Sequence, residues 1–116
     1  MEYNSDFRYD LKVGQGAENF LGQLLEGNTL EVKMDKRAHQ TGLIFVEFES
    51  RGKPSGIATS EADYWAYVIE GKGAVIVSKE TMRKKVRQAI RIRGKLKGGD
   101  SNTSLGTLVA VKDLLT

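Results

Sequence analysis

"LEVKMDKRAHQTGLIFVEFES", residues 30 to 50, is the stretch that decides the fold. Apolar and polar residues alternate over residues 29–35. Residues 43–49 continue the pattern, with Ile44, Val46 and Phe48 on one face and Leu43, Phe45, Glu47 and Glu49 on the other. This alternation has the period of a half-buried strand. A short polar connection joins the two segments, so we expect two neighbouring strands that pair antiparallel and place Glu31 opposite Glu47.

The expected pairing would bring carboxylates together. Like charges opposite one another on a sheet repel, at a cost of up to roughly 1 kcal/mol. A divalent cation would offset that cost, because hard cations favour oxygen ligands. Glu18, on the edge of an amphipathic helix expected over residues 15–26, could approach the same point. We therefore expect Glu18, Glu31 and Glu47 to bind Mg²⁺ or Mn²⁺, with Lys33 beside them. The alternative is a surface charge ladder in which Lys33 pairs with an acid.

The rest of the chain adds further helices and strands. A loop with two glycines and the only proline leads to a short helical turn, and YWAYVI and AVIVS predict a buried hairpin. Residues 78–91 carry apolar side chains at helical spacing and basic ones elsewhere, and LGTLVAVKDLLT predicts a last strand. FRYDLKV, residues 7–13, is a candidate for one more strand. We expect a single domain over residues 1–116, of the α/β (α+β) class, with a mixed sheet flanked by helices.

The charge is distributed unevenly along the chain. Residues 1–70 hold seven Lys and Arg against twelve Asp and Glu, whereas residues 71–116 hold eleven against three. A basic half attracts polyanions, and an acidic cluster repels them unless a cation intervenes. The combination favours a metal-dependent enzyme that acts on nucleic acid. The competing interpretation is a basic helix that is merely solvated.

The placement of the acids along the chain also resembles that in a known protein family. A helix Glu, an acid on one strand, and an acid on the next strand with a lysine nearby resemble the PD-(D/E)XK nuclease superfamily, which includes Holliday-junction resolvases, repair nucleases and restriction endonucleases. The resemblance covers about residues 14–69 and implies a restriction-endonuclease-like αβββαβ core. By this likeness Glu18 is the helix acid, Glu31 stands where the family usually has Asp, and Glu47 is the acid of the E-x-K motif.

The sequence departs from the family at the motif lysine, since that position is Glu49. Lys33, two residues past Glu31, would take its place, a variation that the superfamily tolerates. A rival alignment takes EVK, Glu31 to Lys33, as the E-x-K motif and Asp10 as the preceding acid. It places the family's Asp before the helix, a position that the family's topology disfavours. ESRGKPSGIATSEADYW is also similar to small nuclease-like proteins from bacteriophage.

These features together predict a divalent-metal-dependent DNA endonuclease that is phage-encoded, uses metal-activated water and acts in recombination, repair or degradation. Glu18, Glu31, Glu47 and Lys33 would be catalytic, no organic cofactor is expected, and a homodimer would cut duplex or branched DNA. The alternative is a non-catalytic nucleic-acid-binding module with a degenerate nuclease site. The expected DNA contacts are Arg51, Lys53 and Ser55 in the glycine-bearing loop and Arg83, Lys84, Arg87 and Arg91 on the basic helix.

Composition bounds the remaining possibilities. The chain has no cysteine, which excludes a disulfide framework, a thiolate metal site and a catalytic thiol. It has no apolar run near the roughly 18 residues of a membrane span, and its polar start lacks the apolar stretch of a signal peptide. We expect no membrane partner and a cytoplasmic location, in the host cell if the protein is phage-encoded.

Overall fold

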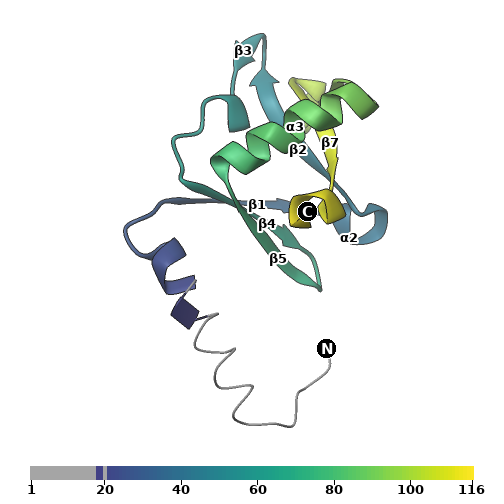
Figure 1. Ribbon diagram of the computed structural model, residues 1–116. Coiled ribbons are helices and arrows are strands. Elements are labelled where there is room, and N and C mark those ends of the chain that lie inside the picture. The colour runs from purple at the N-terminus through teal and green to yellow at the C-terminus, as the bar shows by residue number, and fades with distance from the viewer. Residues whose placement is uncertain (1–17, 20) are drawn as a thin grey trace.

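The computed structural model describes residues 18–19 and 21–116 (Figure 1). Residues 18–19 and 21–25 are helical, which agrees with the expected N-terminal helix over the part described. The candidate strand at residues 7–13, and Asp10 of the rival alignment, lie outside the described residues.

The described chain combines short strands with helical turns and one longer helix, α3. None of its helices is both long enough and apolar enough to cross a membrane. In chain order the strands and helices are β1 (Leu30–Asp35), α2 (Ala38–Thr41), β2 (Leu43–Ser50), β3 (Lys53–Pro54), a 3₁₀ turn (Gly56–Ala58), β4 (Tyr64–Ile69), β5 (Gly73–Ser78), α3 (Lys79–Arg93), β6 (Leu96–Gly98), a second 3₁₀ turn (Asp100–Asn102), β7 (Ser104–Ala110) and a third (Val111–Leu115).

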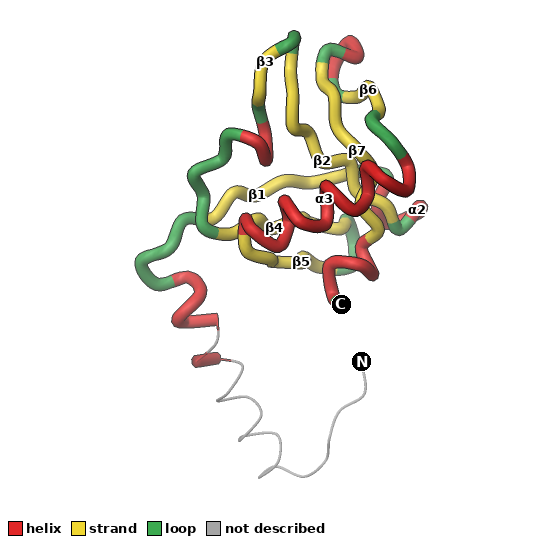
Figure 2. Tube along the Cα trace, turned by 45° about the horizontal axis from the view of Figure 1, so that its top comes forward, coloured by secondary structure: helices red, strands yellow, loops and turns green. Residues whose placement is uncertain are grey.

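The strands form two sheets (Figure 2). One has the order β1-β4-β5, in which β1 runs parallel to β4 and β4 antiparallel to β5. The other has the order β3-β2-β7-β6 and is antiparallel throughout. The expected α/β (α+β) class with a mixed sheet is confirmed. The restriction-endonuclease-like core stays a prediction.

The pairing expected between the first two strands is wrong. β1 pairs with β4, which sets Glu31 beside Trp65, and β2 pairs with β7, which sets Glu47 beside Gly106. The two acids therefore belong to different sheets. The alternation located both strands, but it does not say which strand is the neighbour. It also misjudged the buried face of β1, because Leu30, Val32 and Met34 are exposed.

The connection between β1 and β2 explains why they separate. It is not a hairpin turn but the helical turn α2, which ends at Gly42 in the left-handed conformation with φ of 70°. Asp35 stabilises this crossover, because its two carboxylate oxygens accept hydrogen bonds from the backbone amides of Arg37 and Phe45, both at 2.8 Å. The chain thus leaves one sheet and enters the other.

Helix α3 covers one face of the second sheet. Ser78 caps the helix through a hydrogen bond from the amide of Thr81 at 3.1 Å, as Ser at this position often does. The apolar stripe of α3 packs against alternate residues of β2 and β7, whereas the intervening residues of β2 face the opposite way. The buried residues at this contact are Ile44, Val46, Met82, Val86, Ala89 and Val109.

Candidate functional site

A cleft of about 840 Å³ opens on the face of β2 that points away from α3. It lies between the end of β1, the near face of β2 and the segment from β6 to the second 3₁₀ turn. Cations outnumber acids among the charged residues of its lining, so the cleft favours an anionic ligand. The charged residues are Lys33, Lys36, Arg37 and Lys97 together with Asp35 and Glu47.

Glu47 is the most tightly positioned carboxylate in this cleft. Its Oε2 accepts a hydrogen bond from the hydroxyl of Ser55 at 2.8 Å, and its Oε1 accepts one from the hydroxyl of Ser104. A β-bulge follows directly, between Glu47 and Glu49. Bulges are common next to active sites, where they re-aim side chains. Glu47 is thus held from two sides by segments that are distant in sequence.

The loop after β3 brings Ser55 to Glu47 through a close backbone contact. Gly56 has φ of +55°, and a Cβ atom there would lie 2.3 Å from the carbonyl oxygen of Glu47. The amide of Ser55 also donates to the carbonyl oxygen of Phe48 at 3.0 Å. The Pro-Ser-Gly sequence therefore has a structural reason, since only glycine permits the loop to pack this closely against β2.

Asp35 is a second carboxylate in the cleft, and the sequence analysis did not assign it to the site. It shares a face of β1 with Glu31 and Lys33. Each of its oxygens accepts one backbone hydrogen bond and keeps a further lone pair for another partner. The sequence contained one signal for Asp35 as a site residue. In EVKMD it lies on the same strand face as Glu31 and Lys33, which were already expected at the site.

The buried hydroxyl of Tyr67 lies in the negative electrostatic field of the carboxylates around the cleft. It donates to the carbonyl oxygen of Phe45 at 3.2 Å. Burial raises the pKa of Tyr67 above its ordinary value, and the charges of Asp35, Glu47 and Glu31 raise that pKa further. Tyr67 therefore stays protonated and acts as a hydrogen-bond donor in the wall of the cleft.

Lys33 lines the cleft and forms an ion pair with Glu31 at its edge. Its ammonium nitrogen lies 3.9 Å from a carboxylate oxygen of Glu31, with both side chains close to half exposed. The same nitrogen lies 6.0 Å from the ring centroid of Trp65. Lys33 lines the cleft and Glu31 does not, so the ion pair expected under the charge-ladder alternative is present at the rim.

The three acids expected to share a cation are not brought together. Glu18 is exposed on the N-terminal helical segment and, like Glu31, does not line the cleft, whereas Glu47 does. Within residues 18–19 and 21–116, no group of three or more His, Asp or Glu side chains is placed to hold a metal ion. The physical reason is the strand pairing, because β1 is hydrogen-bonded to β4 rather than to β2.

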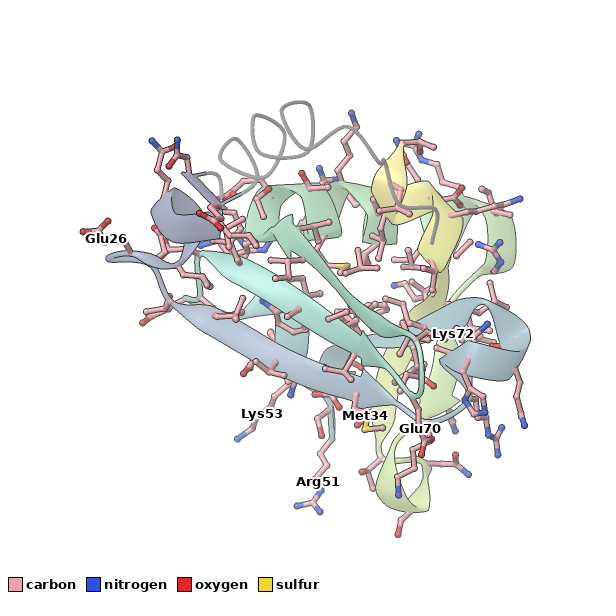
Figure 3. All side chains as sticks on the ribbon, turned by 90° about the horizontal axis from the view of Figure 1, so that it is seen from below. Glu26, Met34, Arg51, Lys53, Glu70 and Lys72 are labelled. Atoms are coloured by element: carbon pink, nitrogen blue, oxygen red, sulfur yellow. The ribbon has the colours of Figure 1, made fainter. Side chains whose placement is uncertain are left out.

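The residues expected to contact DNA divide between two sides of the molecule. Figure 3 shows Arg51 and Lys53 projecting away from α3, which is the side on which the cleft opens. Ser55 lies between them and the cleft and donates to Glu47. The exposed basic residues of α3 lie across the sheet from the cleft, so they do not surround the same site; they are Lys84, Arg87 and Arg91. The cations that do line the cleft, apart from Lys33, were not assigned from the sequence; they are Lys36, Arg37 and Lys97.

Arg83 has a different environment from the other basic residues of α3. Its guanidinium donates to the carbonyl oxygens of Ile57 at 3.0 Å, Ser60 at 3.3 Å and Ala58 at 3.5 Å. These contacts tie the helix to the loop that carries Ser55. Arg83 is thus occupied with folding contacts rather than presented to a ligand.

We expect Arg83→Ala to lower the free energy of unfolding by about 1.5–3 kcal/mol, because the substitution leaves carbonyl oxygens without a charged donor. Arg87→Ala, on the exposed face of the same helix, should change it by no more than about 0.5 kcal/mol. Urea denaturation measures both. Equal stability of the two variants would contradict a structural role for Arg83.

Comparison of the chain with protein-family models, curated proteins and solved structures found no match.

Proposed function

We propose that this chain is a divalent-metal-dependent DNA endonuclease that hydrolyses phosphodiester bonds, of the PD-(D/E)XK kind that its sequence resembles. The observation that carries the proposal is the cleft, in which Glu47 is clamped by two hydroxyls, Asp35 lines the same space, and four cations accompany the two acids. A cleft lined by two carboxylates and four cations suits a phosphodiester, because the carboxylates can bind a metal ion and the cations can bind phosphate oxygens.

Asp35 and Glu47 fit Mg²⁺ or Mn²⁺ by the chemistry of their donor atoms. Mg²⁺ in proteins usually takes one or two carboxylates and completes its shell with water and substrate phosphate oxygens. The two carboxylates retain lone pairs that their hydrogen bonds do not use. We therefore propose these two residues as ligands. When bound, such an ion would make a water molecule more acidic and would stabilise the departing oxygen.

The remaining cleft residues would bind and orient the substrate. Lys33, at the rim, would donate to a phosphate oxygen and offset the charge that grows on it during attack. Lys36, Arg37 and Lys97 would neutralise neighbouring phosphates without reading sequence. Tyr67, which stays protonated, would help to keep this wall of the cleft in place through its bond to the backbone of β2.

We propose a homodimer as the form that cuts both strands of a duplex or branched DNA. One such cleft would act on one strand, and a second copy would bring a second cleft to the other strand. A phage-encoded enzyme of recombination, repair or DNA degradation remains the setting that the sequence resemblance favours.

The test is a cleavage assay with the purified chain on linear, branched and single-stranded DNA. We expect cleavage with Mg²⁺ or Mn²⁺ and none after chelation with EDTA. Mn²⁺ at about 100 times its dissociation constant should also stabilise the fold by about 2.7 kcal/mol, which calorimetry without DNA can detect. Absence of both cleavage and stabilisation would refute the proposal.

A non-catalytic nucleic-acid-binding module is the second candidate. It is favoured by Asp35, whose two backbone hydrogen bonds already give it a role in folding, and by Glu49 at the position of the motif lysine. This candidate predicts DNA binding that weakens steeply with salt, no cleavage, and no change in melting temperature with Mn²⁺.

A further inference from the structure

One wall of the cleft is apolar, and it adjoins the proposed catalytic carboxylate. On the sheet that carries Glu47, the register places Phe45 beside Leu108, and it places both Glu47 and Leu96 beside Gly106. Side chains at paired positions share a face, so these apolar groups lie next to Glu47 on the cleft side. All of them line the cleft except Gly106.

Two glycines let the ring of Phe45 lie flat over this wall. A Cβ atom at Gly98 would lie 2.6 Å from the ring atom Cζ of Phe45, and one at Gly106 would lie 2.7 Å from the same atom. The ring therefore occupies the space that side chains at both positions would fill. With Leu96 and Leu108 it makes a continuous apolar surface beside the carboxylates.

A base-paired duplex offers this surface little apolar area beyond the methyl groups of thymine in its major groove. It presents a charged, hydrated backbone, and burying polar groups against apolar side chains costs free energy unless they find partners. The flat faces of its bases are stacked inside. A single strand, by contrast, offers phosphates to cations and base faces to apolar or aromatic side chains, which is the usual composition of single-strand grooves.

The size of the cleft fits the same substrate. About 840 Å³ lies within the range of roughly 300–1,000 Å³ that is typical of sites enclosing a small organic group. Enzymes that act on an unstacked nucleotide hold it in a pocket lined by aromatic or apolar side chains. The cleft has room for such a unit.

We infer that the substrate strand is unpaired where it enters the cleft. An unstacked base lies against Phe45, Leu96 and Leu108, and the adjoining phosphate lies at Asp35 and Glu47, in the cleft that the cations also line. This inference rests on the proposed nuclease function and specifies its substrate class.

The test compares three DNA substrates of one sequence with the full chain and Mn²⁺: a single strand, a continuous duplex, and a duplex with a central unpaired bubble. We expect the single strand and the bubble to be cut at least tenfold faster than the duplex, with cuts in the bubble falling in its unpaired part. A continuous duplex cut as fast as the single strand would overturn the inference and leave the nuclease function standing. Absence of any cleavage would overturn both.

A variant of the apolar wall gives an independent readout. Leu96 is 36% exposed, so Leu96→Ser should leave the fold intact, which thermal melting checks. We expect it to lower the ratio of single-strand to duplex cleavage at least threefold. Ile92→Ser, at a residue of α3 that is 71% exposed and away from the cleft, should leave that ratio unchanged. An unchanged ratio in Leu96→Ser would contradict contact between this wall and a base.

Discussion

Replacing Glu47 by Gln will abolish cleavage and leave DNA binding in place. Glutamine has nearly the same shape, but it loses the negative charge that attracts a divalent cation to a carboxylate ligand. Removal of one electrostatic group from an active site lowers kcat by about 10²–10³-fold, and we expect at least this loss. Single-turnover cleavage and a filter-binding assay measure the two properties separately.

The fold should tolerate Glu47→Gln, because the surrounding hydroxyls can adapt. Ser55 and Ser104 donate to the two carboxylate oxygens, and a serine hydroxyl can rotate to accept a bond from the new amide. The free energy of unfolding should fall by no more than about 1 kcal/mol. A large loss of stability would assign Glu47 to folding instead of chemistry.

Glu49→Gln is the matched control. Glu49 lies on the same strand, beyond the bulge, and does not line the cleft. Its substitution removes the same charge a short distance away and should change the cleavage rate by less than about twofold. If the two variants lost activity equally, a general effect of charge would explain the result better than coordination by Glu47.

Hydrophobic periodicity predicted the principal strands and the long helix because each is long enough to repeat its period. β1, β2 and β4 lie within the stretches so identified, whereas β5, α3 and β7 overlap theirs and extend one or two residues beyond them. The end of the last stretch, Val111–Leu115, is a 3₁₀ turn and not part of the expected strand. Strand β6, Leu96–Gly98, was expected to be part of a polar loop. Three residues are too few to show a period, and Gly98 is needed for the close approach of Phe45, which is far away in sequence.

The partner of each strand could not be predicted from alternation, and this is why Glu31 and Glu47 were expected opposite one another and lie in different sheets. Alternation correctly put Glu31 and Lys33 on one face of β1 and Glu47 on one face of β2. The neighbour of each strand depends on the crossover at α2, which Asp35 stabilises with two backbone hydrogen bonds. One of these bonds links Asp35 to the amide of Phe45, ten residues later, and alternation does not predict a contact of that kind. The same contact places Asp35 in the cleft, so the missed residue and the wrong pairing have one cause.

Gly56→Ala should destabilise the fold more than a glycine substitution usually does, and it should also disturb the site. Alanine at φ of +55° costs about 1–2 kcal/mol for its left-handed conformation. The new Cβ would lie 2.3 Å from the carbonyl oxygen of Glu47, and the forced shift adds about 1–3 kcal/mol. We expect the free energy of unfolding, measured by urea denaturation, to fall by about 2–5 kcal/mol.

Gly71→Ala separates the two contributions to this loss. Gly71 has φ of +73° and no atom within 4 Å of the position of a Cβ, so alanine there should cost only the conformational part, about 1–2 kcal/mol. Cleavage should fall with Gly56→Ala, because moving the loop withdraws the Ser55 hydroxyl from Glu47, and it should be unchanged with Gly71→Ala. Equal losses of stability in the two variants would show that the backbone of β2 at Glu47 moves easily to accept a Cβ atom at position 56. This result would contradict a rigid placement of Glu47 by the loop that carries Ser55.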